Sequence, residues 1–191
     1  MASMENVRLQ EASESYRKVL RYFFSFPGQP ISLNDLSRNI KSSKTSTKAA
    51  VMRLIKEGFL KKEVIGNAWR ISAEPKNQFA ITRKIPYNLE IIYESGVIAR
   101  VYNKIPEARA IVLFGSYRWG TDNEKSDIDI GVEVLGNKPM RIETLLKFDN
   151  LGFRKNVKVN LHIFSRAKIG LNLFTNIANG IVLDGLLEVR P

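Results

Sequence analysis

The chain has 191 residues, of which 44% are hydrophobic, and a formal net charge of +11 at pH 7. This length accommodates one large or two small domains, and no apolar run approaches the roughly 18 residues of a membrane span. The absence of cysteine excludes disulfides and thiolate metal sites. Residues 1–18 lack the apolar core of a signal peptide, so a soluble, cytoplasmic protein is expected.

The positive charge is distributed unevenly. Residues 1–80 carry 14 basic and 7 acidic side chains, whereas residues 81–191 carry 16 and 12. Such an excess favours a polyanionic partner or substrate, and the first part of the chain is the more nucleic-acid-like. Basic surfaces also serve solubility, so the charge alone does not decide between the two.

Three helices are expected before Gly58. The first has apolar residues at i, i+3, i+4, i+7 and i+8 and ends before Pro27. Ser32 is the expected N-cap of the second helix, and Gly58 ends the third. The inward positions are Tyr16, Val19, Leu20, Phe23 and Phe24, then Leu33, Leu36 and Ile40, then Thr47, Ala50, Val51, Leu54 and Ile55.

Two β-rich runs follow these helices. FLKKEVI (residues 59–65) and AWRIS (68–72) are joined by Gly66 and Asn67, a pair suited to a tight hairpin turn. Three helices followed by a hairpin resemble the winged helix-turn-helix modules of many prokaryotic DNA-binding proteins. The resemblance rests on pattern rather than on an invariant motif, and it implies a winged helix-turn-helix domain over residues 1–75.

The third expected helix has a basic face. Lys44, Lys48 and Lys56 lie at i, i+4 and i+12, opposite the apolar stripe. Such a face fits a major groove, with Thr45 and Ser46 near base edges or phosphates at the first turn. The alternative is a solvated lysine face on a module that contacts only proteins. The basic excess favours nucleic acid, with Lys44, Thr45, Ser46 and Lys48 as the candidate contacts.

A polar, proline-containing stretch at residues 72–78 separates the two halves of the sequence. We therefore expect a linker over residues 76–87 and a second domain over residues 88–191. The expected elements are a helix at 88–104, strands at 109–114, 128–134 and 157–164, a helix after Pro139 containing Ile142, Leu145, Leu146 and Phe148, and a final helix from Leu171 to Gly180 before the apolar run 181–183. This alternation predicts an α/β (α+β) fold with a mixed sheet.

The sharpest pattern in this second domain is LFGSYRWGTDNEKSDIDI, residues 113–130. Asp127 and Asp129 are two residues apart at the start of a strand, so their side chains share a face and can share a cation. Carboxylates suit Mg²⁺, which takes its other ligands from substrate phosphates and water. Gly115 allows a phosphate to approach closely, and the Ser116 hydroxyl and the following N–H groups can donate to phosphate oxygens. The pattern indicates a site for a metal-bound triphosphate.

This pattern strongly resembles the signature of the DNA polymerase β-like nucleotidyltransferase superfamily. The matching parts are GSYRWG, the spacer from Tyr117 to Ser126, and then DID. The resemblance is closest to its minimal nucleotidyltransferases and covers about residues 88–185. It implies that Gly115 and Ser116 hold the phosphates of an NTP. It also implies that Asp127 and Asp129 are catalytic ligands of Mg²⁺ or Mn²⁺, at which a nucleoside monophosphate is transferred with loss of pyrophosphate.

The chain departs from the family pattern at a third carboxylate, which family members carry on a later strand to bind metal and favour deprotonation of the attacking hydroxyl. The matching segment VKVNLHIF has Asn160 there, and an amide cannot accept that proton. Glu133 and His162 are candidate replacements. Glu133 lies roughly 13 Å along the strand from Asp129, which makes it a poor one. His162, the only histidine, also fits an ordinary half-buried strand position.

A second departure lies in the glycine turn. Arg118 and Trp119 stand where small family members present a small residue and then a basic one. The guanidinium of Arg118 matches phosphate geometry, which makes it a candidate phosphate ligand. Trp119 either stacks on a base or packs against the adjacent helix, and the packing interpretation is favoured.

Three functions fit the sequence. The first is an active, Mg²⁺-dependent nucleotidyltransferase whose winged helix recruits a nucleic acid or protein acceptor. The second is a degenerate nucleotidyltransferase fold that binds nucleotide without transferring it. Asn160, in place of the third carboxylate, suggests this function. The third is a DNA-binding regulator whose C-terminal domain mediates dimerisation or partner binding. The resemblance also implies a small helical partner protein, as in modules resembling toxin–antitoxin pairs.

Overall fold

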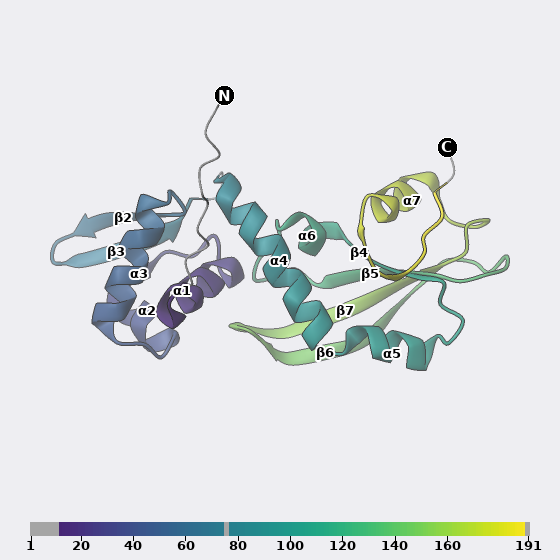
Figure 1. Ribbon diagram of the computed structural model, residues 1–191, viewed down its shortest axis with the longest axis horizontal. Helices are drawn as coiled ribbons and strands as arrows, with labels where there is room; N and C mark the ends of the chain where they lie inside the picture. The colour runs from purple at the N-terminus through teal and green to yellow at the C-terminus, as the bar shows by residue number, and fades with distance from the viewer. Residues whose placement is uncertain (1–11, 75–76, 190–191) are drawn as a thin grey trace, which may run out of the picture.

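The computed structural model describes residues 12–74 and 77–189, which form two halves connected by a long helix (Figure 1). Residues 1–11, 75–76 and 190–191 lie outside this description. They include part of the stretch in which the domain boundary is expected. No helix among the described residues is both long and apolar enough to cross a membrane.

The N-terminal half contains the three expected helices and the hairpin. Its elements are α1 (Glu14–Ser25), β1 (Ile31–Ser32), α2 (Leu33–Asn39), α3 (Lys44–Lys56), β2 (Leu60–Ile65) and β3 (Ala68–Ala73). The strands form an antiparallel sheet in the order β1-β3-β2. Ser13, Ser32 and Ser43 each cap a helix by accepting a backbone N–H bond three residues on. The predicted apolar stripes meet in one core, in which Val19, Leu36, Val51 and Leu54 are fully buried.

The helix that connects the halves corrects two expectations. Residues 78–87, expected as linker, belong to α4 (Gln78–Glu94), and the single helix expected at 88–104 is interrupted. Gly96 adopts a left-handed φ of 70° before α5 (Val97–Lys104), and that conformation ends one helix and starts the next. α4 is continuous because it packs on both cores, through Tyr87 on the N-terminal one and Ile92 on the C-terminal one.

The C-terminal half is built on a mixed five-stranded sheet in the order β6-β7-β5-β4-β8. Its elements are β4 (Ala110–Phe114), α6 (Gly115–Trp119), β5 (Ile128–Glu133), β6 (Arg141–Leu151), β7 (Arg154–Phe164), α7 (Leu171–Ala178) and β8 (Ile181–Gly185). β5 and β7 are parallel, and the other neighbours are antiparallel. One core lies between this sheet and helices α4 and α5, and another lies under α7. The predicted mixed α/β class is therefore confirmed.

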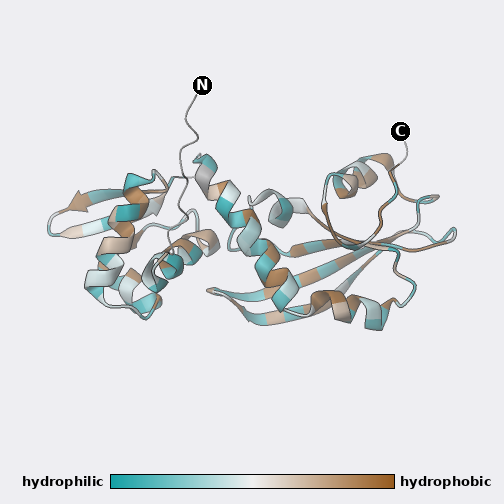
Figure 2. Ribbon diagram, viewed as in Figure 1, coloured by the Kyte–Doolittle hydropathy of each residue, from teal (hydrophilic) through white to brown (hydrophobic). Residues whose placement is uncertain are grey.

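The prediction of a helix after Pro139 is wrong, because this segment forms strand β6. Its apolar residues suggested a helix, but a register shift between Thr144 and Leu146 breaks the alternation of a regular strand and places Leu145 beside Leu146. Gly152, with a φ of 59°, opens a two-residue turn into β7. β6 is an edge strand and is mostly exposed, so it carries the mixed hydropathy visible in Figure 2.

Candidate nucleotide and metal site

The Gly-Ser turn lies directly against the acidic pair. β4 is fully buried and runs straight into Gly115, and its antiparallel register with β5 pairs Phe114 with Asp129. Gly115 has a φ of 70°, and a Cβ atom there would lie 3.1 Å from Oδ2 of Asp129. Only glycine fits such a turn without strain or crowding. The structure thus brings Gly115, the half-buried Ser116 and Asp129 together, as the motif predicts.

The acidic residues lie beside two side chains of β7. Asp127 precedes β5, Asp129 is its second residue, and both are partly exposed. The parallel register aligns Asp129 with Asn160. Nδ2 of Asn160 lies 3.4 Å from Oδ2 of Asp127, and Nε2 of His162 lies 3.1 Å from Oδ1 of Asp129. Two carboxylates, one amide and one imidazole therefore share one face of the sheet.

These contacts distinguish between the two candidate replacements for the third carboxylate. Glu133 is 2% exposed at the far end of β5, where Oε1 accepts a 2.7 Å hydrogen bond from Nε of Arg166. It therefore cannot serve this site. His162 lies within the site, with its ring packed edge-on against Phe114 at a centroid distance of 4.9 Å. His162 is thus a half-buried strand residue and also a neighbour of Asp129.

The donor set offers few ligands to a metal ion. The described residues contain no group of three or more His, Cys, Asp or Glu side chains that could hold one. Asp127 and Asp129 nevertheless match a hard cation that takes its other oxygens from phosphates and water. The residues present fit a divalent cation that arrives with a nucleotide.

Arg118 and Trp119 contact each other. Nε of Arg118 donates a 2.7 Å hydrogen bond to the backbone oxygen of Asn179, which caps the C-terminus of α7. The centre of its guanidinium lies 3.8 Å from the Trp119 ring centroid. Trp119 is 50% exposed, so the predicted packing against the adjacent helix covers at most part of its ring and stays a prediction. Phosphate binding by Arg118 stays a prediction.

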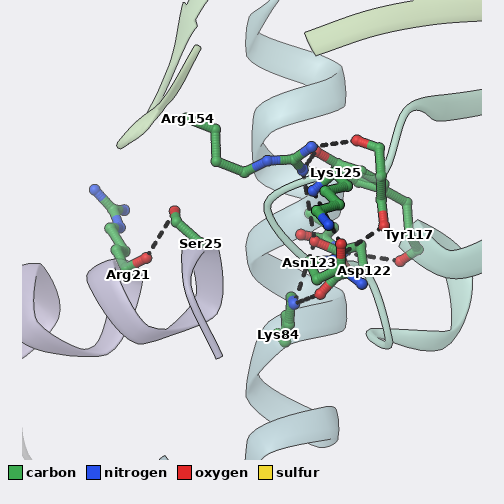
Figure 3. Close-up of polar contacts among 10 residues, drawn as sticks. Arg21, Ser25, Lys84, Tyr117, Asp122, Asn123, Lys125 and Arg154 are labelled. Carbon is green, nitrogen blue, oxygen red and sulfur yellow. Dashed lines mark hydrogen bonds and ion pairs between the residues drawn. The ribbon is translucent and has the colours of Figure 1, made fainter. Parts of the chain in front are cut away.

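A buried polar cluster that the sequence does not predict lies behind this site. It consists of Lys84 and Asn88 from α4, Tyr117 from α6, Asp122 from the loop before β5, and Arg154 from β7. Figure 3 shows Lys84 and Arg154 pointing toward Asp122 from different elements. Burial lowers the pKa of the Lys84 ammonium, and the negative charge of Asp122 opposes that shift. The only sequence signal was the isolated polar residues Lys84 and Asn88 within a helical apolar pattern.

A cavity of about 690 Å³ adjoins this cluster. Phe24 and Phe59 of the N-terminal half line it, together with Lys84, Asp122 and Lys125. The loop that precedes Asp127 lines this cavity, whereas Asp127 and Asp129 do not.

The four predicted nucleic-acid contacts lie apart from this site, on the first turns of α3 in the other half of the molecule (Figure 1). Lys44, Thr45, Ser46 and Lys48 are all exposed. Nζ of Lys48 lies 5.4 Å from the ring centroid of Trp69 on β3.

Comparison with known proteins gives one family match. The chain matches no curated protein. Residues 97–184 match the family model described as polymerase beta, nucleotidyltransferase. The matched region is somewhat less than half of the chain and includes the Gly-Ser turn, both aspartates and Asn160. This match supports the assignment of the C-terminal half as a polymerase β-like nucleotidyltransferase domain. The mixed sheet, which brings the turn and the aspartates together, is consistent with it.

Proposed function

We propose that this protein is a Mg²⁺- or Mn²⁺-dependent nucleotidyltransferase that transfers a nucleoside monophosphate from an NTP to an acceptor hydroxyl. The observation that carries the proposal is the contact between the Gly115 turn and Asp129, within a region that matches the nucleotidyltransferase family. Gly115 and Ser116 bind the phosphates, with Arg118 beside them. Asp127 and Asp129 hold the cation, which neutralises charge that develops on the phosphates.

The reaction breaks a phosphoanhydride bond of the NTP and forms a phosphoester bond to the acceptor. The acceptor oxygen bonds to the α-phosphorus, the bond from this phosphorus to the bridging oxygen breaks, and pyrophosphate leaves. The chain must position the α-phosphorus against the acceptor, and the junction of the buried strand β4 with α6 suits that task. Asn160 cannot take the proton of the acceptor, so we expect slow transfer.

Label transfer from α-labelled NTPs tests this function. The assay contains Mg²⁺ or Mn²⁺ and a crude lysate as acceptor source, and compares wild type with Asp127→Asn and Asn160→Asp. We expect slow labelling by wild type, none by Asp127→Asn, and labelling at least about tenfold faster by Asn160→Asp, because the new carboxylate can accept a proton.

The second candidate function is nucleotide binding without transfer, and Asn160 is the observation that favours it. Its amide bonds to Asp127 in place of the family's acid. If wild type transfers no label but binds nucleotide, and Asn160→Asp gains transfer, the protein is a nucleotide-binding regulator on an enzyme's scaffold. If no variant binds or transfers nucleotide, both candidate functions are wrong.

For the N-terminal half we propose a nucleic-acid-binding winged helix-turn-helix. Two observations support this proposal. The N-terminal half consists of three helices and a three-stranded antiparallel sheet, and the first turn of α3 carries exposed lysines. In this arrangement Thr45 and Ser46 lie where the helix N-terminus and its N–H groups favour phosphate.

Removal of both lysines from this turn should weaken DNA binding in a salt-dependent way. Each phosphate contact contributes about 0.9 to the slope of log affinity against log salt. Lys44→Ala with Lys48→Ala should therefore lower the slope magnitude by up to about 2 on duplex DNA. The control is Lys147→Ala with Lys158→Ala, a pair of exposed lysines on β6 and β7. Equal slopes for wild type and both double variants would exclude α3 as the DNA contact.

A further inference from the structure

Four polar side chains between α4 and the nucleotide site are almost completely buried. Lys84 is 4% exposed, Asn88 1%, Asp122 3% and Arg154 5%. Charged side chains are rarely buried this deeply unless they are paired, since removing them from water is expensive. Asp122 is the single carboxylate in the cluster, so its one negative charge faces two cationic side chains.

The contacts of the cluster converge on Asp122. Its Oδ2 lies 3.2 Å from Nζ of Lys84 and 3.9 Å from Nη1 of Arg154. Its Oδ1 accepts a 2.8 Å hydrogen bond from Nδ2 of Asn88, and its backbone oxygen accepts another from Lys84. One carboxylate thus binds donors from α4 and from β7 (Figure 3).

The same donors also hold both halves of the nucleotide motif. Asn88 donates a 2.9 Å hydrogen bond to the backbone oxygen of Tyr117, the residue after Ser116. Arg154 donates to the Tyr117 hydroxyl and, through Nη2, to the backbone oxygen of Ser126, the residue before Asp127. The residues next to the phosphate-binding turn and next to the acidic pair are therefore connected through one cluster.

We propose that Asp122 is a positioning residue that sets the placement of the Gly-Ser turn relative to the acidic pair. Its carboxylate orients Asn88 and Arg154, and these hold Tyr117 and Ser126. Asp122 acts through these residues and does not itself contact substrate in this scheme. An effect of Asp122 on nucleotide binding rests on the proposed function. Its effect on the conformation of the loop that leads to Asp127 does not.

The helix α4 extends this arrangement to the N-terminal half. Tyr87, between Lys84 and Asn88 in the sequence, packs on Phe24 of α1 with ring centroids 5.5 Å apart. Arg21 of α1 binds Glu90 of α4 through both carboxylate oxygens at 3.1 Å. The helix that supplies two of the Asp122 partners is thus fixed to the N-terminal half.

Asp122→Asn in the full chain tests the role, with Glu133→Gln as the matched control. The asparagine keeps an oxygen for Asn88 but loses the charge that faces Lys84 and Arg154. Glu133 is equally buried and also binds an arginine, Arg166, but at the opposite end of β5. Both variants remove a buried carboxylate charge and should lower the melting temperature, so a general loss of stability affects both.

Two measurements distinguish a positioning role of Asp122 from a general loss of protein stability. The first is hydrogen exchange of the amides of residues 120–127, at a temperature where all variants are folded. The second is the affinity for the Mn²⁺ complex of α,β-methylene-ATP, an analogue that resists transfer. In Asp122→Asn we expect exchange to rise about tenfold and affinity to fall about tenfold, whereas Glu133→Gln stays within about twofold of wild type.

Unchanged exchange in Asp122→Asn, or equal changes in both variants, would overturn the inference. If wild type binds no nucleotide, the proposed function fails, and the exchange result alone decides whether Asp122 sets this loop. If Asp122→Asn does not fold, Lys84→Met combined with Asp122→Asn removes both charges of the pair, and the same exchange comparison is made on that double variant.

Discussion

Asp129→Asn is expected to weaken Mn²⁺-dependent binding of α,β-methylene-ATP by about 100-fold. With two carboxylates available, loss of one removes half of the charged ligands that the protein offers a cation. The amide is a weaker ligand and carries no charge. Titration calorimetry with the Mn²⁺ complex measures the effect, and excess EDTA should abolish binding by wild type.

The fold should survive this substitution. The Asp129 side chain is 32% exposed and contributes little apolar burial, so the melting temperature should change by only a few degrees. Asp149→Asn is the matched control, because it removes an exposed carboxylate from β6 in the same half of the molecule. An affinity in Asp129→Asn equal to that of the control would exclude Asp129 as a metal ligand.

The geometry of the candidate site was largely predictable because its signals are local in the sequence. The spacing of Asp127 and Asp129 fixes a shared strand face, and Gly115 at the end of an apolar run marks a turn with close approach. Only the resemblance to the family could predict that Asn160 lies beside Asp127. This contact depends on the parallel pairing of β5 with β7, which local patterns do not encode.

Other features depended on contacts distant in the sequence. The apolar residues of β6 fit a helical pattern as well as a bulged strand, and pairing with β7 selects the strand. Most of the stretch expected as linker is helical. Its Ala80 and Tyr87 pack on the N-terminal core, and the same helix continues to Ile92 in the C-terminal core. In the sequence Asp122 is one polar residue of a polar loop, and only the fold shows its buried partners.

Gly115→Ala should impair both stability and nucleotide binding. Alanine at a φ of 70° costs roughly 1–2 kcal/mol, which should lower the melting temperature by several degrees. In addition, the new methyl group would lie 3.1 Å from Oδ2 of Asp129 and would crowd the carboxylate. We therefore expect a loss of Mn²⁺–nucleotide affinity of about tenfold or more on top of the stability loss.

Gly96→Ala separates the two effects. Gly96 has the same φ of 70°, but nothing lies within 4 Å of the position of its added Cβ, at the junction of α4 and α5. The backbone strain is thus matched while the contact with the acidic pair is absent. Thermal unfolding should show similar destabilisation in both variants, and calorimetry should show weakened nucleotide binding only in Gly115→Ala. Equal affinities in the two variants would mean that the close approach of Gly115 to Asp129 serves the fold rather than the nucleotide.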